Sequence, residues 1–304
     1  MSPNRNRFFQ DISYKDAPGP GALVQRVSRF AGMPAGIQLN SDWYLQHMRF
    51  DEDSKIPTNA VNWTITEQGA ATQAISSDLF PPHLILTNAA ADNDSQELQW
   101  TAGDGSGEWA SLTVPGRPHY FEIMMRVADA NQDADTIEQV EWFVGFAVTD
   151  TTVLDGTTDY IGFVNQDLDD DSGQDIDFTC ADAGTTLLDG LTPVATGWDT
   201  DITTSGISAA NTAAGRVLRR AARHVGPNDW FKLAFLVEPG ADVGTTNEGT
   251  AYVYVNDVCT NIVNLADQVP DQELALTIAF QNGEAVAKIL HIAYITVAAK
   301  YGII

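Results

Sequence analysis

The carboxylates of the run DLDDDSGQD, residues 167–175, are the side chains of this sequence whose spacing most suggests chemistry. Asp167, Asp169 and Asp171 stand at alternate positions, and oxygen ligands on a flexible loop are what Ca²⁺ requires. A calcium loop of the helix–loop–helix type has Gly at its sixth position and Glu at its twelfth. Here Gly173 comes one place late and the Glu is missing. The run is therefore either a weak calcium site or, as its composition favours, a solvated acidic loop.

No other set of residues predicts an enzyme. Glu138 and Glu141 are a carboxylate pair of the kind that glycosidases use, but a spacing of three places them on opposite faces of a strand. A pair brought together from distant strands stays open. The sequence has no G-x-S-x-G nucleophile elbow, no P-loop and no dinucleotide fingerprint. Cys180 and Cys259 are predicted to stay reduced thiols rather than to form a disulfide. We therefore expect no catalytic residue and no cofactor.

Arginines gather in the segment 209–224, which is read either as a helix or as an arginine-bearing strand. Its cationic members are Arg216, Arg219, Arg220 and Arg223. Such a group can bind phosphate or nucleic acid, but in a chain of net charge −25 we expect it to pair with acidic groups of this chain or of a neighbouring copy.

The charge balance limits the classes of partner. The chain of 304 residues has 41 acidic side chains against 16 Lys and Arg, which opposes nonspecific binding to nucleic acid or to anionic membranes. The acidic surface is either a solubilising device or an adaptation to salty water. The N-terminus lacks the apolar segment of a secretory signal, and no apolar run is long enough for a membrane helix. We expect a protein made in the cytoplasm, with no contact to membrane.

The first 58 residues differ from the rest of the chain. They are punctuated by Pro and Gly, as in the run 18–21, yet they are rich in aromatic residues. Pro and Gly disfavour long helices and central strands. Residues 1–58 are therefore predicted to be an extended arm that lies along its own body or along a neighbouring subunit. The residues predicted to bind a partner are Phe8, Phe9, Tyr14, Arg26, Arg29, Phe30, Trp43 and Tyr44 of the arm, with Arg219, Arg220 and Arg223 of the body.

From residue 59 to residue 304 the pattern is strand after strand. The runs are rich in Val, Ile, Thr and aromatic residues, are bounded by Gly, Asn, Asp and Pro, and several alternate between apolar and polar positions. Strands are predicted at 60–66, 83–87, 97–101, 109–114, 120–127, 140–149, 160–164, 176–180, 230–237, 250–255, 274–280 and 289–297. The chain is therefore predicted to be all-β, with residues 59–304 forming one β-sandwich domain.

The order of these strands resembles a concanavalin A-like jelly roll over roughly residues 119–300. The runs VEWFVGFAVTD (140–150) and DYIGFVNQD (159–167) are similar to paired successive strands of that fold. GTAYVYVNDVCTN (249–261) resembles the late hairpin with its Asn-Asp turn, and the segment 273–300 the closing pair of strands. The E-x-D-x-E strand of jelly-roll glycosidases is missing. The resemblance implies a jelly-roll β-sandwich and says little about function.

An arm attached to such a body is also similar to structural proteins of tailed-bacteriophage virions. This resemblance implies a decoration, or cement, protein on the outside of the capsid, with the major capsid protein and copies of itself, as a homotrimer, for partners. It implies a place in the virion and no direct contact with nucleic acid. The alternative is a carbohydrate-binding, lectin-like module of a tail fibre or receptor-binding protein, which uses the same fold.

Overall fold

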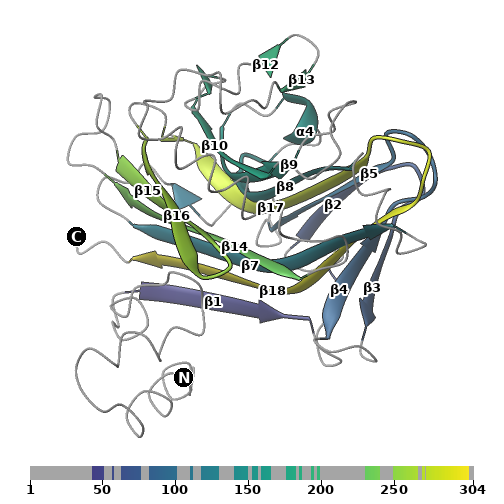
Figure 1. The fold of residues 1–304 in the computed structure, drawn as a ribbon, viewed down its shortest axis with the longest axis horizontal. Helices are drawn as coiled ribbons and strands as arrows, with labels where there is room; N and C mark the ends of the chain where they lie inside the picture. The colour runs from purple at the N-terminus through teal and green to yellow at the C-terminus, as the bar shows by residue number, and fades with distance from the viewer. Residues whose placement is uncertain are drawn as a thin grey trace, which may run out of the picture.

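The chain folds into two antiparallel β-sheets that pack face to face, as the computed structural model shows (Figure 1). The predicted fold class, an all-β jelly-roll sandwich, is confirmed by this architecture. The structure describes residues 43–50, 57, 63–76, 82–100, 110–111, 118–129, 140–149, 153–156, 159–165, 176–182, 185–186, 193–194, 197–198, 230–239, 249–265, 269–270 and 272–300.

Sheet 1 lies low in Figure 1 and runs in the order β16-β15-β14-β7-β18-β4-β3, with β1 also paired to β18. Its strands are β1 (Trp43–Arg49), β3 (Thr72–Ser76), β4 (His83–Thr87), β7 (His119–Asp129), β14 (Phe231–Pro239), β15 (Gly249–Val255), β16 (Val258–Asn264) and β18 (Lys288–Lys300). The long strand β18 pairs with β4 through its first half and with β1 through its second half.

Sheet 2 lies above sheet 1 and runs in the order β11-β10-β9-β8-β17-β5-β2, with β6 paired to β17. Its strands are β2 (Trp63–Gln68), β5 (Ser95–Trp100), β6 (Ala110–Ser111), β8 (Val140–Ala147), β9 (Tyr160–Asn165), β10 (Ile176–Asp182), β11 (Thr185–Thr186) and β17 (Glu273–Asn282). The short helix α4 (Val153–Gly156) and the strand pair β12 (Pro193–Val194) and β13 (Gly197–Trp198) complete the elements that the structure describes.

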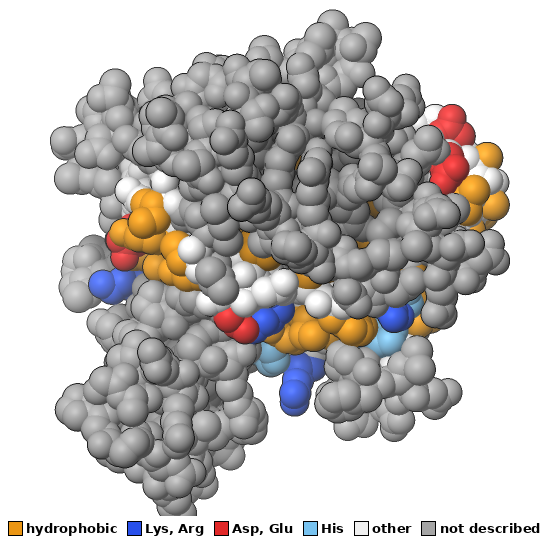
Figure 2. Space-filling model, in the orientation of Figure 1, with side chains coloured by type: hydrophobic (Ala, Val, Ile, Leu, Met, Phe, Trp, Pro, Cys, Tyr) orange, Lys and Arg blue, Asp and Glu red, His pale blue; other side chains and the backbone are white. Residues whose placement is uncertain are grey.

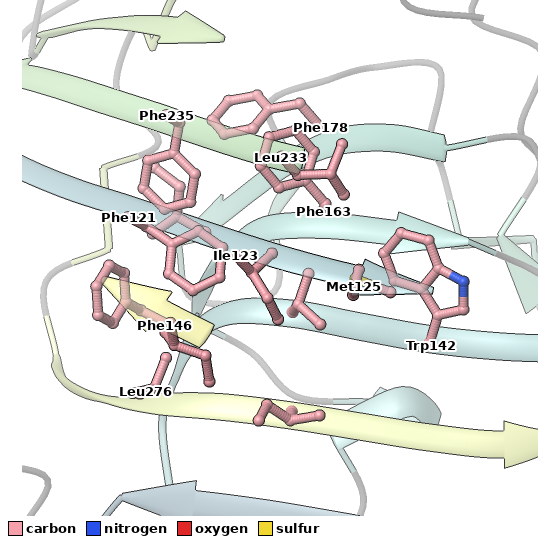
Figure 3. Packing of buried hydrophobic residues seen from close by; sticks show 14 of the residues in the cluster. Phe121, Ile123, Met125, Trp142, Phe146, Phe163, Phe178, Leu233, Phe235 and Leu276 are labelled. Atoms are coloured by element: carbon pink, nitrogen blue, oxygen red, sulfur yellow. The ribbon is translucent and has the colours of Figure 1, made fainter. Parts of the chain in front are cut away.

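The core lies between the inner faces of the two sheets and is dominated by aromatic rings (Figure 3). Phe235 of β14 is central to it, because its ring lies 5.3 Å from that of Phe121 and 5.4 Å from that of Phe178, between ring centroids. Ring pairs at these separations add to the free energy gained by burying apolar area. The interlocked rings fix how the two sheets lie against each other.

A β-bulge in β18 keeps both halves of that strand facing the core. Leu290 and Ile292 point inward before the bulge, and Ile295 and Val297 point inward after it. One extra residue, Ala293, resets the alternation of side chains between the two faces. Without it the second half of β18 would turn its apolar side chains to the outer face.

The hairpin of β15 and β16 turns through Asn256 and Asp257, which both have positive φ, at 48° and 69°. Two consecutive residues of positive φ are typical of the type I′ turn, whose twist matches that of a β-hairpin. The hairpin and its Asn-Asp turn were predicted from the sequence, and the structure confirms them.

Predicted and observed strands agree for most of the sandwich, but the described strands β1, β3, β11, β12 and β13 were missed, and β16 was expected only as the second strand of the hairpin in the jelly-roll resemblance. Residues 43–49, which the sequence analysis places in the arm, form β1, and Phe50 enters the core. The short polar strand β3 was also missed. Residues 1–42 and the segment 209–224 lie outside the described residues. No disulfide joins Cys180, which is buried, to Cys259, which is exposed. None of the described helices is long and apolar enough to cross a membrane.

Candidate functional site

The outer face of sheet 1, which points away from the core, has rows of side chains that run straight across the strands. The register aligns one apolar row, which comprises Ile262, Tyr252, Leu236, Tyr120, Ala298 and Leu45. A second row comprises Tyr254, Ala234, Glu122, Thr296 and His47. Outer faces of antiparallel sheets are usually polar when they meet water. This face instead carries tyrosines and apolar residues, and they form a cluster of their own.

Glu122 lies at the centre of this face and is fully buried. The hydroxyl of Tyr120 donates to its Oε2 at 2.6 Å, and the hydroxyl of Tyr294 donates to its Oε1 at 2.8 Å. Burial raises the pKa of Glu122 to about 7, while the two tyrosines and Lys232 act in the opposite direction. The pKa values of both tyrosines are raised too, mainly by burial, so they remain hydrogen-bond donors.

His47 lies next to Glu122 and its two tyrosines, on the side of β1. Its Nδ1 lies 2.8 Å from Oγ1 of Thr296, and its ring centroid lies 5.2 Å from that of Tyr294. Burial, and then the charge of Arg49, lowers the pKa of His47 to about 4. His47 is therefore neutral near pH 7 and supplies a polar ring rather than a charge.

The opposite side of the face is formed by the β15–β16 hairpin. Tyr252 is partly exposed and hydrogen-bonded to Glu238, whose charge raises the pKa of Tyr252. Burial, the largest cause, raises the pKa of the neighbouring Tyr254 to about 12. Nζ of Lys232 forms an ion pair with Asp257 in the turn. Two tyrosine rings thus lie beside charged groups here, and Glu238 holds the hydroxyl of Tyr252.

A second cluster lies on the same face, further along β7 and β18. Cζ of Arg126 lies 5.3 Å from the ring centroid of Trp230, and its Nη2 donates to Nε2 of His291 at 3.3 Å. His83 packs beneath them, with its ring centroid 4.9 Å from that of His291 and 5.3 Å from that of Trp230. Burial, then Arg126, then His83 lowers the pKa of His291 to about 3, so His291 accepts the hydrogen bond as a neutral ring.

Positive charge gathers on this face. The described Lys and Arg residues are Arg49, Arg126, Lys232, Lys288 and Lys300. All except Lys288 stand at outward positions of sheet 1, by the alternation of their strands. In Figure 2 the blue and pale blue side chains in view lie low, where Figure 1 places this sheet. These four cations share the described part of the face with the carboxylates of Glu122, Glu238 and Asp257, so it lacks the large acidic excess of a chain of net charge −25.

The outer face of sheet 2 is covered by α4, which packs on small residues and on the rings of Phe143 and Tyr160. Gly145 and Gly162 stand opposite each other, and a Cβ on Gly162 would come within 2.5 Å of the carbonyl oxygen of Val144. Val153 of α4 is buried on this face, and its N–H donates to Oε1 of Glu97 at 2.9 Å. This face serves packing within the chain.

Most of the predicted site residues lie outside the described residues. These are Phe8, Phe9, Tyr14, Arg26, Arg29 and Phe30 of the arm, Arg219, Arg220 and Arg223 of the arginine group, Asp167, Asp169 and Asp171 of the acidic loop, and Glu138 of the carboxylate pair. Trp43 and Tyr44 are placed by their backbone, at the start of β1. Within the described part of the chain, no group of three or more His, Cys, Asp and Glu side chains is able to hold a metal ion.

The tyrosine face, which is the outer face of sheet 1 around Tyr120, Tyr252, Tyr254 and Tyr294, was not predicted by the sequence analysis. Part of the pattern that indicates it was nevertheless present in the sequence. YVYV, residues 252–255, alternates tyrosine with valine, so that one face of β15 is aliphatic and the other aromatic. Tyr120 and Glu122 share a face because they are two residues apart on β7, but the approach of Tyr294 to Glu122 had no such signal. Tyr294 lies 172 residues from Glu122 in sequence, and the bulge in β18 decides the face on which it stands.

No protein-family model matches this chain, and no curated protein matches it in sequence. Among solved structures, it is similar to the carbohydrate recognition domain of Emp47p, with 10% identity, coverage of 84% of this chain and 95% of that chain, and a TM-score of 0.45. A protein of unknown function from Shewanella oneidensis MR-1 has 11% identity, coverage of 85% and 87%, and a TM-score of 0.46. Peanut lectin has 10% identity, coverage of 85% and 97%, and a TM-score of 0.41. Similarity at this level concerns the fold and says nothing about ligand or activity.

Proposed function

We propose that this chain is a non-catalytic carbohydrate-binding protein and that the outer face of sheet 1 binds the glycan. The observation that carries this proposal is the set of partly exposed tyrosines on that face, Tyr252, Tyr254 and Tyr294, set among hydrogen-bonded polar groups. A sugar ring has apolar C–H faces and a rim of hydroxyl groups. Tyrosine matches both, because it presents an apolar ring with a polar tip.

Positions of the tyrosines are fixed before any ligand arrives. Tyr294 is held by Glu122, and Tyr252 is held by Glu238. They stand on paired strands of a sheet whose other face is the core, so little side-chain entropy remains to be lost on binding. A rigid aromatic platform of this kind suits a weakly hydrophobic ligand.

A large protein partner fits this face less well than a glycan does. A stable protein interface buries roughly 800 Å² on each partner and has an apolar core. Among the described residues, the one large hydrophobic side chain that is exposed is Ile262, at 57%. The remaining accessible surface of the face is aromatic and charged, which is the composition that an amphipathic small ligand requires.

The capsid-decoration hypothesis stays a prediction. It depends on contacts made by residues 1–42 and by the arginine group, which lie outside the described residues. A homotrimer, a capsid partner and a place in the virion rest on the same residues and stay predictions with it.

Glycan arrays test the proposed function. The intact chain is expected to bind a defined group of glycans, and Tyr252→Ala and Tyr254→Ala are each expected to lower the affinity about tenfold by removing a stacking surface. Titration calorimetry with the best glycan measures the loss. Absence of any saturable glycan binding would refute the proposal.

Two matched variants sharpen this test. Tyr252→Phe keeps the ring and removes the hydroxyl, so it should retain most of the affinity if stacking dominates. Ile262→Ala removes the exposed aliphatic side chain beside Tyr252 and should leave glycan affinity within twofold. If Ile262→Ala weakens binding as strongly as Tyr252→Ala does, the face is a general hydrophobic contact surface for protein.

A further inference from the structure

Arg126 has a set of neighbours that is unusual in so acidic a chain. With 41 Asp and Glu side chains present, a partly exposed arginine normally finds a carboxylate. Lys232 and Lys288 do so, with Asp257 and Glu284. Arg126 instead contacts the ring of Trp230 and the neutral ring of His291, and it forms no ion pair with a described residue. Its guanidinium is held in place by two rings, and no carboxylate of the described residues neutralises it.

The donors of Arg126 are only partly used. Its Nη2 donates to Nε2 of His291, while its Nε has no hydrogen-bond partner. A guanidinium binds carboxylate or sulfate through two parallel N–H groups, and an aromatic ring stacked on its plane fixes the orientation of that fork. Because Nε is buried, the donors that face a planar or tetrahedral anion are the N–H groups of the two Nη atoms other than the one donated to His291.

His291 keeps the arrangement in a single state. Because its Nε2 accepts from Arg126, its hydrogen is on Nδ1, which has no hydrogen-bond partner. Burial and the two neighbouring groups keep the pKa of His291 at about 3, so this ring stays neutral throughout the physiological range. It supports the guanidinium from one side without adding a second positive charge.

Arg126 belongs to the same surface as the tyrosines. Arg126 and Glu122 lie four residues apart on β7 and point to the same side, which separates them by about 13 Å. Tyr294 stands opposite Met124, between those two positions. A ligand of a few sugar units reaches from the tyrosine face to the guanidinium.

We propose that Arg126 binds the carboxylate or sulfate group of an acidic glycan whose sugar rings lie on the tyrosines of the same face. The inference rests on the proposed function and names the class of glycan. The cations of this face favour an anionic ligand, which the net charge of −25 of the whole chain would otherwise repel. Trp230 and His291 are positioning residues for the guanidinium.

The test is a glycan array that contains neutral, carboxylated and sulfated glycans, followed by calorimetry on matched pairs. Each pair comprises a uronic acid oligosaccharide and its methyl ester, or a sulfated oligosaccharide and its desulfated form. Wild-type protein is expected to bind the charged member at least tenfold more tightly, with an affinity that falls as salt rises from about 50 to 500 mM. Which pair shows the difference identifies the anion as carboxylate or sulfate.

Variants assign the effect to Arg126. Arg126→Gln is expected to lower the affinity for the charged glycan about 30-fold and to change the affinity for its neutral counterpart less than threefold. Arg126→Lys should recover only part of the loss, because it keeps the charge and lacks the fork. Lys300→Gln removes a charge from the same face and should change the affinity less than threefold. Circular dichroism melts establish that each variant is folded.

The possible outcomes separate the two proposals. Equal affinity for both members of every pair, or charged-glycan binding that survives Arg126→Gln, overturns the role of Arg126 and leaves the glycan function standing. An array with no bound glycan overturns both. The salt dependence and the matched pairs use wild-type protein alone, so the proposal stays testable if Arg126→Gln fails to fold.

Discussion

The outer faces of the two sheets differ in the side chains that they carry. The outer face of sheet 2 combines small residues, such as Ala275, Thr277 and Ala279 of β17, with the buried rings of Phe143 and Tyr160, and α4 packs on this apolar cluster. Sheet 1 presents tyrosines, histidines and cations around a buried carboxylate. Both faces are made by alternation on antiparallel strands, so secondary structure does not distinguish them. The size and polarity of the outward residues do.

The comparison teaches where ligand recognition is able to reside in this fold. On the outer face of sheet 2, other parts of the chain such as α4 approach closely, and the apolar side chains form a second buried cluster. A face of tyrosines held by carboxylates keeps rings at the surface with fixed orientations. The predictions below, ordered by the size of the effect, test whether the two faces differ in this way.

The largest effect on stability is expected from adding side-chain volume at Gly162, on the outer face of sheet 2. A Cβ at Gly162 would lie 2.5 Å from the carbonyl oxygen of Val144 and 2.9 Å from Cα of Gly145, and backbone cannot move aside easily. Gly162→Val should lower the free energy of unfolding by about 3 kcal/mol, as measured by urea denaturation. Thr250→Ile, on a partly exposed outward position of β15, should change it by less than about 0.5 kcal/mol. Similar costs at the two sites would contradict the difference between the faces.

The next largest effect on stability concerns Glu122, the buried carboxylate on the outer face of sheet 1. The pKa of Glu122 is raised from 4.5 to about 7, so the folded protein holds this proton more tightly than the unfolded chain does. The stability contributed by the protonated form is fully present below pH 4.5 and is lost as pH rises towards 7. The stability of wild type relative to Glu122→Gln should therefore fall by about 2 to 3 kcal/mol between pH 4.5 and pH 8. A difference that stays constant with pH would show that folding leaves the pKa of Glu122 at its ordinary value.

Removing a tyrosine ring from the outer face of sheet 1 should lower glycan affinity more than it lowers the free energy of unfolding. Tyr252 is partly exposed, so Tyr252→Ala is expected to lower the free energy of unfolding by only about 1 kcal/mol. The same change is expected to lower glycan affinity about tenfold. Denaturation and calorimetry on one preparation measure both quantities. A stability loss as large as that of Gly162→Val would identify Tyr252 as part of a packed core.

The smallest effect on the free energy of unfolding is expected at the β15–β16 turn, which borders the outer face of sheet 1. Asp257 has a φ of 69°, which favours Gly, and its ion pair with Lys232 is on the surface. Asp257→Gly should raise the free energy of unfolding by about 0.5 kcal/mol, because relief of the strained backbone outweighs a weak surface ion pair. Thermal unfolding monitored by circular dichroism measures the change. A lower melting temperature would mean that the ion pair holds the hairpin onto β14.

Much of the sandwich was predictable because its strands carry their own signal. Runs such as 120–127 and 230–237 are apolar, β-branched and aromatic, and each became a strand with bounds close to those expected. The turn at Asn256 and Asp257 was expected from the resemblance of residues 249–261 to the late hairpin of a jelly roll, and both residues have positive φ. β1 was missed because its alternation, with Met48 and Phe50 inward, stands after a stretch rich in Pro and Gly.

The sequence by itself determined that this protein is acidic, that it is all-β, and where most of its strands and its tightest turn lie, because those properties follow from composition and from contacts between near neighbours. Only the tertiary structure decided which side chains share a face. Tyr294 reaches Glu122, and Arg126 meets His291 and Trp230, through strand pairing across more than a hundred residues and through one bulge in β18. A shift of one residue in that register would send each of these groups to the opposite face, and nothing local in the sequence specifies the register.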